Sequence, residues 1–152
     1  MRNLETILDE HPFFRGLESG LLKTIAGCGK QVRFEAGSYL YRQGDPADTF
    51  YILRHGRVGL ELREPKGAVL FHTEHEGGIL NAAWIVPPYR CGNDARALDT
   101  AVAIALDGAC LRGKCETDNH LGYELMKRFV PVLVERLSEA RFQALDVYGQ
   151  KA

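Results

Sequence analysis

The six residues that begin at Phe71, Phe-His-Thr-Glu-His-Glu, form the densest group of side chains that could bind a metal ion. The imidazoles of His72 and His75 and the carboxylates of Glu74 and Glu76 are ligands that divalent transition metals accept. Side chains on a β-strand alternate between its faces, so the two histidines, three residues apart, would point in opposite directions. They could share one ion only if a turn intervened, and a glycine pair does follow closely. We expect solvated polar residues here, and a metal-dependent enzyme is the alternative.

The second group of side chains that could carry chemistry consists of the four cysteines, Cys28, Cys91, Cys110 and Cys115. The N-terminal residues alternate apolar with acidic types and lack the apolar block of a signal peptide, so we expect a cytoplasmic protein with four free thiols. No pair has the Cys-X-X-Cys spacing, and no zinc set is complete in the sequence near any of them. Cys91 follows Arg90 and could carry a thiol of lowered pKa for redox sensing. No base is placed for nucleophilic catalysis, so we predict that the chain is not an enzyme and needs no metal.

Composition and charge limit the classes of partner. The chain has 152 residues, of which 45% are hydrophobic and 26% charged, which suits one soluble domain over residues 1–152. The formal net charge of -1 provides no general attraction to nucleic acid or to an anionic membrane. We therefore predict neither direct DNA binding nor a membrane partner.

Three regions follow one another along the chain. Residues 1–30 show two short amphipathic segments that are separated at Pro12, where a helix must end. Residues 31–108 consist of short apolar runs between glycine and proline turns, which is typical of an all-β sandwich, roll or barrel. Residues 109–150 return to helical periodicity. The fold class predicted is mainly β with flanking helices.

The long C-terminal helix is predicted to begin after Thr117-Asp118-Asn119, which are good N-cap residues, and to run to about Tyr148. Leu125, Phe129 and Val132 form one apolar stripe on it. The β region can cover one stripe and a twofold copy of the helix the other, so we expect a homodimer, with packing of both stripes inside one chain as the alternative. A kink is expected at Pro131. The other stripe, which would form the dimer face, consists of Met126, Val130, Leu133, Leu137, Ala140 and Ala144.

The segment from Phe34 to Val58 reads Phe-Glu-Ala-Gly-Ser-Tyr-Leu-Tyr-Arg-Gln-Gly-Asp-Pro-Ala-Asp-Thr-Phe-Tyr-Ile-Leu-Arg-His-Gly-Arg-Val. It resembles the first half of the cyclic-nucleotide-binding domains of the catabolite activator and fumarate-nitrate regulator type. Gly37, Gly44 and Gly56 fall where strands would turn the corners of a roll. The resemblance covers nearly the whole chain and implies a β-roll, which is a jelly-roll-like double-stranded β-helix, with short N-terminal helices and a long C-terminal helix.

The resemblance also implies a phosphate-binding cassette at residues 78–93. In the family a carboxylate binds the ribose 2′-hydroxyl, an arginine neutralises the cyclic phosphate, and amides of a short helix assist. Ala82 and Cys91 stand at the positions of the carboxylate and the arginine. Two lost charge-assisted hydrogen bonds cost about 3–6 kcal/mol, so we expect weak cyclic AMP binding. The predicted ligand-binding residues of this degenerate cassette are Leu80, Asn81, Ala82, Ala83, Trp84, Arg90, Cys91, Gly92 and Asn93.

Within the cassette, Arg90 and the helix amides could still hold a cyclic nucleotide or another small anion, with Asn81 or Asn93 bonding a sugar. The alternative for Arg90 is a solvated loop residue or a partner of Asp94. We expect Trp84 in the core rather than as a stacking wall for a ligand. On the long helix, the resemblance places the positions that face the base near Ala140 and Arg141.

Three functions stay open on the sequence. A small-ligand sensor is the main prediction. A ligand-free interaction module with an unknown protein partner is the second, and a cupin-like metal-dependent enzyme is the third. The family's regulators continue past Tyr148 into a helix-turn-helix domain, whereas this chain ends at Ala152, which again leads us to expect no direct DNA binding.

Overall fold

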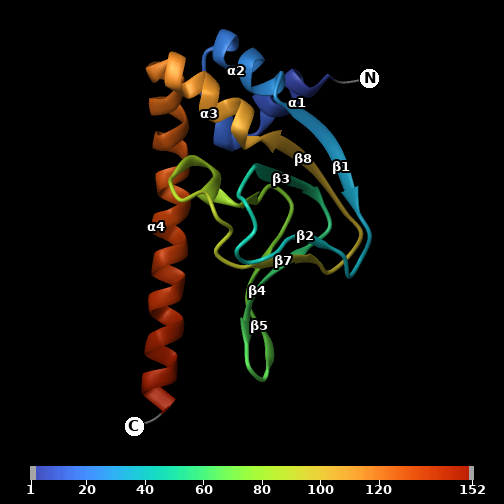
Figure 1. Ribbon diagram of the computed structural model, residues 1–152, viewed down its shortest axis with the longest axis vertical. Helices are drawn as coiled ribbons and strands as arrows, with labels where there is room; N and C mark the ends of the chain where they lie inside the picture. Colours follow the sequence, from blue (N-terminus) through green and yellow to red (C-terminus); the bar gives the residue numbers. More distant parts are fainter. Residues whose placement is uncertain (1–2, 151–152) are drawn as a thin grey trace.

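The computed structural model describes the backbone of residues 3–150 and the side chains of residues 3–146 (Figure 1). Helices lie at both ends of the chain, with the strands between them. The N-terminal helices are α1 (Leu4–Glu10), η1 (Pro12–Phe14) and α2 (Ser19–Ala26), and the C-terminal ones are α3 (Gly108–Thr117) and α4 (Asn119–Gln150). The strands, with one short helix among them, are β1 (Gly29–Phe34), β2 (Tyr39–Tyr41), β3 (Thr49–His55), β4 (Val58–Glu64), β5 (Gly67–Glu74), β6 (Ile79–Leu80), η2 (Ala82–Ile85), β7 (Asp94–Ala97) and β8 (Ala101–Asp107).

The strands form two four-stranded antiparallel sheets with the orders β1-β8-β3-β6 and β2-β7-β4-β5. Buried side chains from both sheets meet in one apolar cluster, among them Leu53 of β3, Leu60 of β4 and Ala95 of β7. A sheet buries one face in this way when apolar residues alternate along its strands. The predicted class, mainly β with flanking helices, is confirmed.

Glycines turn the corners of the roll, as the sequence predicted. Gly37, Gly44 and Gly56 have φ values of 89°, 89° and 86°, in the left-handed region that other residues seldom adopt. Gly56 has a second constraint, because a Cβ at this position would overlap the carbonyl oxygen of Thr100. The backbone at Thr100 therefore lies closer to Gly56 than it could lie to a residue with a Cβ.

A second apolar cluster lies between the β1-β8-β3-β6 sheet and the helices. Leu8 of α1 and Ile25 of α2 are fully buried in it. Phe50 and Ile104 reach it from the sheet, and Phe129 reaches it from α4. The helices therefore cover the outer face of this sheet.

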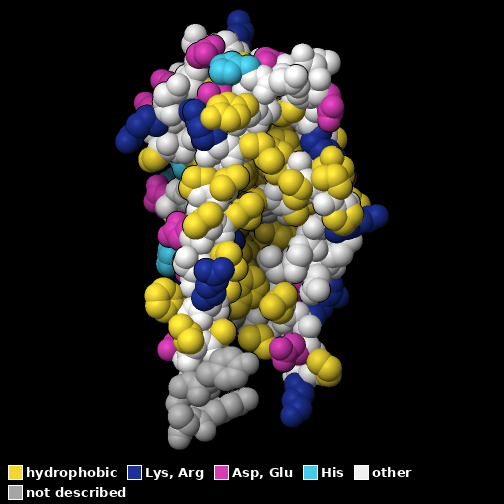
Figure 2. Space-filling model, turned by 90° about the vertical axis from the view of Figure 1, so that its left-hand side faces the viewer, with side chains coloured by type: hydrophobic (Ala, Val, Ile, Leu, Met, Phe, Trp, Pro, Cys, Tyr) yellow, Lys and Arg dark blue, Asp and Glu magenta, His cyan; other side chains and the backbone are white. Residues whose placement is uncertain are grey.

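Helix α4 is half covered and half open. Leu125 and Phe129 are buried, which confirms that one of the two apolar stripes packs inside the chain. The other stripe is uncovered, with Val130 and Leu137 about half exposed, and Figure 2 shows hydrophobic side chains along this helix and in the hollow beside it. The helix is continuous through Pro131, and the kink expected there stays a prediction.

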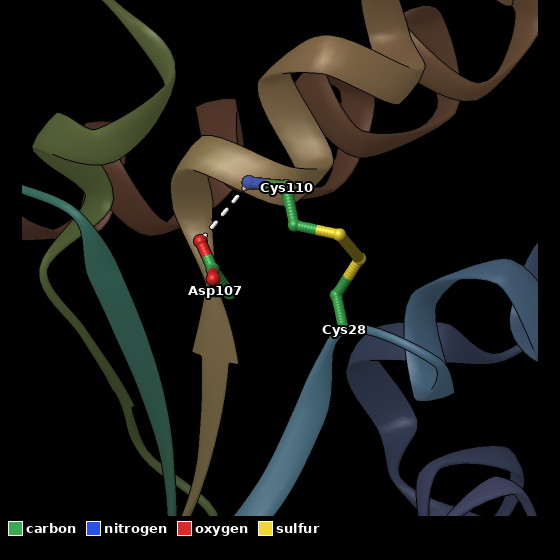
Figure 3. Close-up of a disulfide and its surroundings, with 3 residues drawn as sticks. All are labelled: Cys28, Asp107 and Cys110. Carbon is green, nitrogen blue, oxygen red and sulfur yellow. Dashed lines mark hydrogen bonds between the residues drawn. A yellow bond between two sulfur atoms is a disulfide. The ribbon is translucent and has the colours of Figure 1, made fainter.

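The prediction of four free thiols is wrong. Cys28, just before β1, and Cys110, in the first turn of α3, form a disulfide across 82 residues of sequence (Figure 3). Strand β1 pairs with β8 so that Gly29 lies opposite Leu106, which carries the two cysteines to the same end of the sheet. Cys91 and Cys115 are free. In the part of the chain that the structure describes, no helix has the length and apolar character needed to cross a bilayer.

Candidate functional site

A cavity of about 290 Å³ lies between the roll and the C-terminal half of α4. The cassette forms one wall, and α4 forms the opposite one. The cassette contributes Asn81, Ala82, Ala83, Gly92 and Asn93; α4 contributes Leu133, Arg136, Glu139, Ala140 and Gln143; the sheets add Tyr41, Phe71 and His72.

The cassette wall is shaped by Asn81. This residue has φ 73° and ψ 61°, a left-handed conformation that asparagine tolerates better than most residues, and it leads directly into η2. Its side-chain amide donates to the carbonyl oxygen of Thr49 at 2.8 Å and to the sulfur of Cys91 at 3.5 Å. Although Asn81 lines the cavity, its donor is thus engaged in holding the cassette against β3.

The two positions at which the family resemblance implies charged residues have different surroundings. Ala82 lines the cavity, so a longer side chain there would enter it. Cys91 is buried behind the wall, and its thiol faces the carbonyl oxygen of Pro46 at 3.9 Å. Burial raises the pKa of Cys91, which contradicts the expected lowered value and removes the basis for a reactive thiolate at this position.

Arg90 lies outside the cavity. Its side chain is exposed and donates to the carbonyl oxygen of Gly44 at 3.5 Å. It does not pair with Asp94, whose buried carboxylate lies 3.5 Å from Arg42 and 3.4 Å from Arg63. The structure therefore does not bring Arg90 together with the cassette residues that face the cavity.

Trp84 belongs to the core, as predicted. Its ring is fully buried and stacks on Phe50 with 4.8 Å between ring centroids. Phe129 of α4 approaches it edge-on, with the centroids 5.6 Å apart. The cassette helix is therefore anchored on α4 through this aromatic cluster and not through a ligand.

Charged side chains tie β5 to α4 beside the cavity. Arg136 donates to Glu74 at 2.8 Å and to the carbonyl oxygen of Ile79 at 3.0 Å. The two ring nitrogens of His72 lie 2.6 Å from a carboxylate oxygen of Glu74 and 2.9 Å from one of Glu139. A doubly protonated imidazole would donate to both carboxylates, whereas a neutral ring can donate to only one.

Two further side chains complete the polar lining. Gln143 donates from its amide to the carbonyl oxygen of Phe71 at 2.8 Å, which joins α4 to β5 again. Burial raises the pKa of Tyr41 far above its usual range, so its phenol remains protonated and available as a donor. Of the positions that the resemblance placed on the helix, Ala140 lines the cavity and the exposed Arg141 does not.

Sequence reasoning missed Arg136, Glu139 and Gln143. They lie three and four residues apart on α4, so a helical wheel would have placed them on one face. That face lies beside the apolar stripe, and a charged helix face is ordinarily solvated, so the spacing alone did not mark a site.

The six residues from Phe71 do not converge on one point. His72 and Glu74 contact each other and the partners on α4, while His75 and Glu76 are exposed. Glu74 and Glu139 lie on opposite ring nitrogens of His72, and among the described residues no group of three or more histidine, cysteine or acidic side chains could hold a metal ion. The metal-dependent alternative gains no support from this arrangement.

Residues 31–118 match the family model described as the cyclic nucleotide-binding domain, so the chain belongs to that family. Its domains are regulatory and not catalytic. A 57-residue segment is 36% identical to a cAMP-dependent protein kinase regulatory subunit of Emericella nidulans. That segment is 38% of this chain and 14% of the fungal protein, so the chain corresponds to a small part of that relative.

Solved structures agree with this assignment. A putative cyclic nucleotide-binding protein from Geobacter metallireducens is 27% identical, with a TM-score of 0.79 and coverage of 90% of this chain and 99% of that one. The sensor domain of the transcriptional regulator DNR from Pseudomonas aeruginosa is 21% identical, with a TM-score of 0.69 over 89% of this chain and 91% of that one. At that identity the likeness to DNR concerns the fold alone.

Proposed function

We propose that this regulatory domain is a small-ligand sensor that acts as a homodimer through α4, and that its cavity is not built for tight binding of a cyclic nucleotide. The observation that carries the proposal is the cavity wall itself. The five cassette residues that line it are all uncharged, whereas the family's chemistry needs a carboxylate and an arginine on this wall.

The charged residues on α4, opposite the cassette, do not compensate for the missing carboxylate and arginine. Among the described lining residues, Arg136 is the one arginine or lysine, and Glu74 already engages its guanidinium at 2.8 Å. Glu139 adds a negative charge to the same wall. A cyclic phosphate entering the cavity would meet a carboxylate and an arginine that is already paired, so neutral or zwitterionic ligands suit this site better than anions.

A ligand here would act on the dimer face through α4. The helix supplies five of the residues that line the cavity, including Leu133, which also belongs to the uncovered stripe. A ligand that binds one position of α4 better than another shifts the helix toward that position. Ligand and partner copy would thus contact the same helix.

The test is a binding series on the purified chain. We expect calorimetry to give a dissociation constant weaker than about 0.1 mM for cyclic AMP, since two charge-assisted hydrogen bonds are missing. The change Ala82→Glu, which places a carboxylate in the cavity, should tighten binding by about tenfold, and Ala82→Gln is its matched control. A thermal-shift screen of cyclic GMP and uncharged metabolites would reveal the ligand class. Micromolar cyclic AMP binding by the unaltered chain would refute the proposal.

A ligand-free interaction module is the second candidate, and one observation favours it. Helix α4 is already joined to the roll without any ligand, through the bonds of Arg136 to Glu74, His72 to Glu139 and Gln143 to Phe71. If no compound in the thermal screen raises the midpoint while the unaltered chain remains dimeric, this second function replaces the sensor.

A further inference from the structure

The disulfide joins the N-terminal helical segment to α3. Cys28 ends the N-terminal helical segment, and Cys110 lies in the first turn of α3 (Figure 3). Their Cα atoms are 6.1 Å apart. Only Asp118 separates α3 from α4, so the bridge attaches the N-terminal helices to α3, which leads directly into the helix that lines the cavity.

Both cysteines line a surface groove of about 600 Å³, together with Lys30, Asp48 and Asp107. Cys110 is partly exposed, and Cys28 retains 9% of its exposure. The buried Cys91, by contrast, lines neither this groove nor the cavity beside α4. A small dithiol can therefore approach the bridge without unfolding the core.

We propose that Cys28–Cys110 is a thiol-exchange site, which a dithiol reductant opens and which controls how firmly α3 is held against the cassette. The reductant's thiolate forms a bond with one sulfur while the other sulfur leaves as a thiolate and takes up a proton. The reductant's second thiol then closes its own disulfide and releases the first cysteine as a thiol. Two electrons and two protons pass to the protein, and the dithiol is oxidised.

Arg112 provides the connection from the bridge to the cassette. It lies two residues after Cys110 on α3 and donates to the carbonyl oxygen of Trp84 in η2 at 2.7 Å. It also donates to the carbonyl oxygen of Ala47 at 3.1 Å and pairs with Asp48 at 3.2 Å. A change in the position of the first turn of α3 would therefore change the position of η2, which forms part of the cassette wall of the cavity.

After reduction, the apolar packing of Leu111 and Phe129 in the second cluster and the bond from Arg128 to the carbonyl oxygen of Arg15 at 2.9 Å are retained, but no covalent link remains at the first turn of α3. The backbone amide of Asp107 still donates to the carbonyl oxygen of Cys28 at 2.8 Å, and the exposed pair of His120 and Glu18 still links α4 to α2 at 3.1 Å. Exposed ion pairs contribute little to stability. We therefore expect the reduced form to hold α3 and its Arg112 more loosely, while the roll keeps its fold.

The exchange itself can be tested without any ligand. Thiol titration under denaturing conditions should find two free thiols before treatment and four after incubation of the native chain with dithiothreitol. The melting midpoint should fall by about 10 °C on reduction, and Cys28→Ser should show the lower midpoint in both conditions. Cys115→Ser, which keeps the bridge, is the matched control. Four thiols before treatment, or a bridge that dithiothreitol opens only in denaturant, would overturn the proposal.

The effect of the bridge on the cassette is measured separately. Only its interpretation as control of ligand binding rests on the proposed function. Hydrogen exchange of the amides in η2 and in the first half of α3 should speed up at least threefold in the reduced chain and in Cys28→Ser. Equal exchange in both redox states would refute the connection through Arg112. A chain that binds no ligand yet shows these changes would remove the sensor function and leave the exchange site intact.

Discussion

At the scale of single residues, His11 shows how one side chain joins distant segments. Its Nδ1 accepts the amide of Phe13 at 3.1 Å, so the proton of the neutral ring is on Nε2, which donates to the carbonyl oxygen of Gly77 at 2.9 Å. Burial, which the nearby positive charge of Arg54 reinforces, lowers the pKa of His11, although its bond to Gly77 opposes the change. These two hydrogen bonds require the neutral ring of His11 with its proton on Nε2.

Acid should therefore weaken the folded state through His11. A histidine whose pKa is lower in the folded than in the unfolded chain contributes its full stability above the unfolded value of about 6.5 and loses it as the pH falls toward the folded value. We expect the free energy of unfolding, measured by urea titration, to drop between pH 7.5 and pH 5. His11→Asn keeps a cap for η1 but cannot titrate, so its drop should be smaller. An equal drop in both chains would contradict this role.

Two corner glycines make a matched pair for a second test. Gly56 and Gly37 share nearly the same φ, but an added Cβ at Gly56 meets the Thr100 carbonyl oxygen and one at Gly37 meets nothing within 4 Å. Gly37→Ala should cost about 1 kcal/mol of unfolding free energy from the strained backbone alone. Gly56→Ala should cost at least about 2 kcal/mol more. Similar losses in urea denaturation would show that close approach at Gly56 is unimportant.

At the scale of elements, α4 has one buried and one exposed apolar stripe. The buried stripe joins the core at Leu125 and Phe129, while the stripe through Val130, Leu133 and Leu137 is about half exposed among the residues that the structure describes. Soluble monomers seldom leave so long an apolar surface open. A twofold copy of α4 would bury each stripe against its equivalent.

Replacing Leu133 and Leu137 together by Glu should therefore give soluble monomer, because four carboxylates would face one another at the dimer axis. Light scattering at increasing concentration should show half the mass of the unaltered chain. Glu135→Lys alters the charge of α4 away from this stripe and should remain dimeric. A double variant that retains the full mass would remove α4 as the interface.

At the scale of the whole molecule, polar contacts between β5 and α4 hold the two walls of the cavity together. Arg136 satisfies Glu74, which is only 15% exposed, and also bonds the carbonyl oxygen of Ile79 at the start of β6. Removing the guanidinium leaves a partly buried carboxylate with fewer partners, and such losses cost about 1–3 kcal/mol. The roll and the helix are thus held together by the same residue that lines the cavity.

Arg136→Gln should accordingly destabilise the chain by about 1–3 kcal/mol in urea and speed up hydrogen exchange in the C-terminal half of α4. Arg141→Gln removes an exposed arginine one and a half turns later and should change neither quantity. If the two variants behave alike, Arg136 does not hold α4 to the roll.

Much of the fold could be predicted because its determinants are local. Corner glycines such as Gly44 specify backbone angles wherever they occur, and apolar periodicity specified which face of α4 would be buried. The position of the cassette and the burial of Trp84 followed from the same kind of pattern together with the family resemblance. These features depend on a residue and its near neighbours in sequence.

The rest depended on contacts that no local pattern encodes. Cys28 and Cys110 are 82 residues apart and meet only because β1 pairs with β8. Arg90 lies in sequence between the two groups of cassette wall residues yet is outside the cavity, while Arg136 reaches that cavity from α4. The sequence by itself determined the class of fold, and it placed the uncharged Ala82 and Cys91 where the family resemblance implies a carboxylate and an arginine. Only the tertiary structure decided which side chains line the cavity, because the packing of α4 on the roll sets which groups share one small volume.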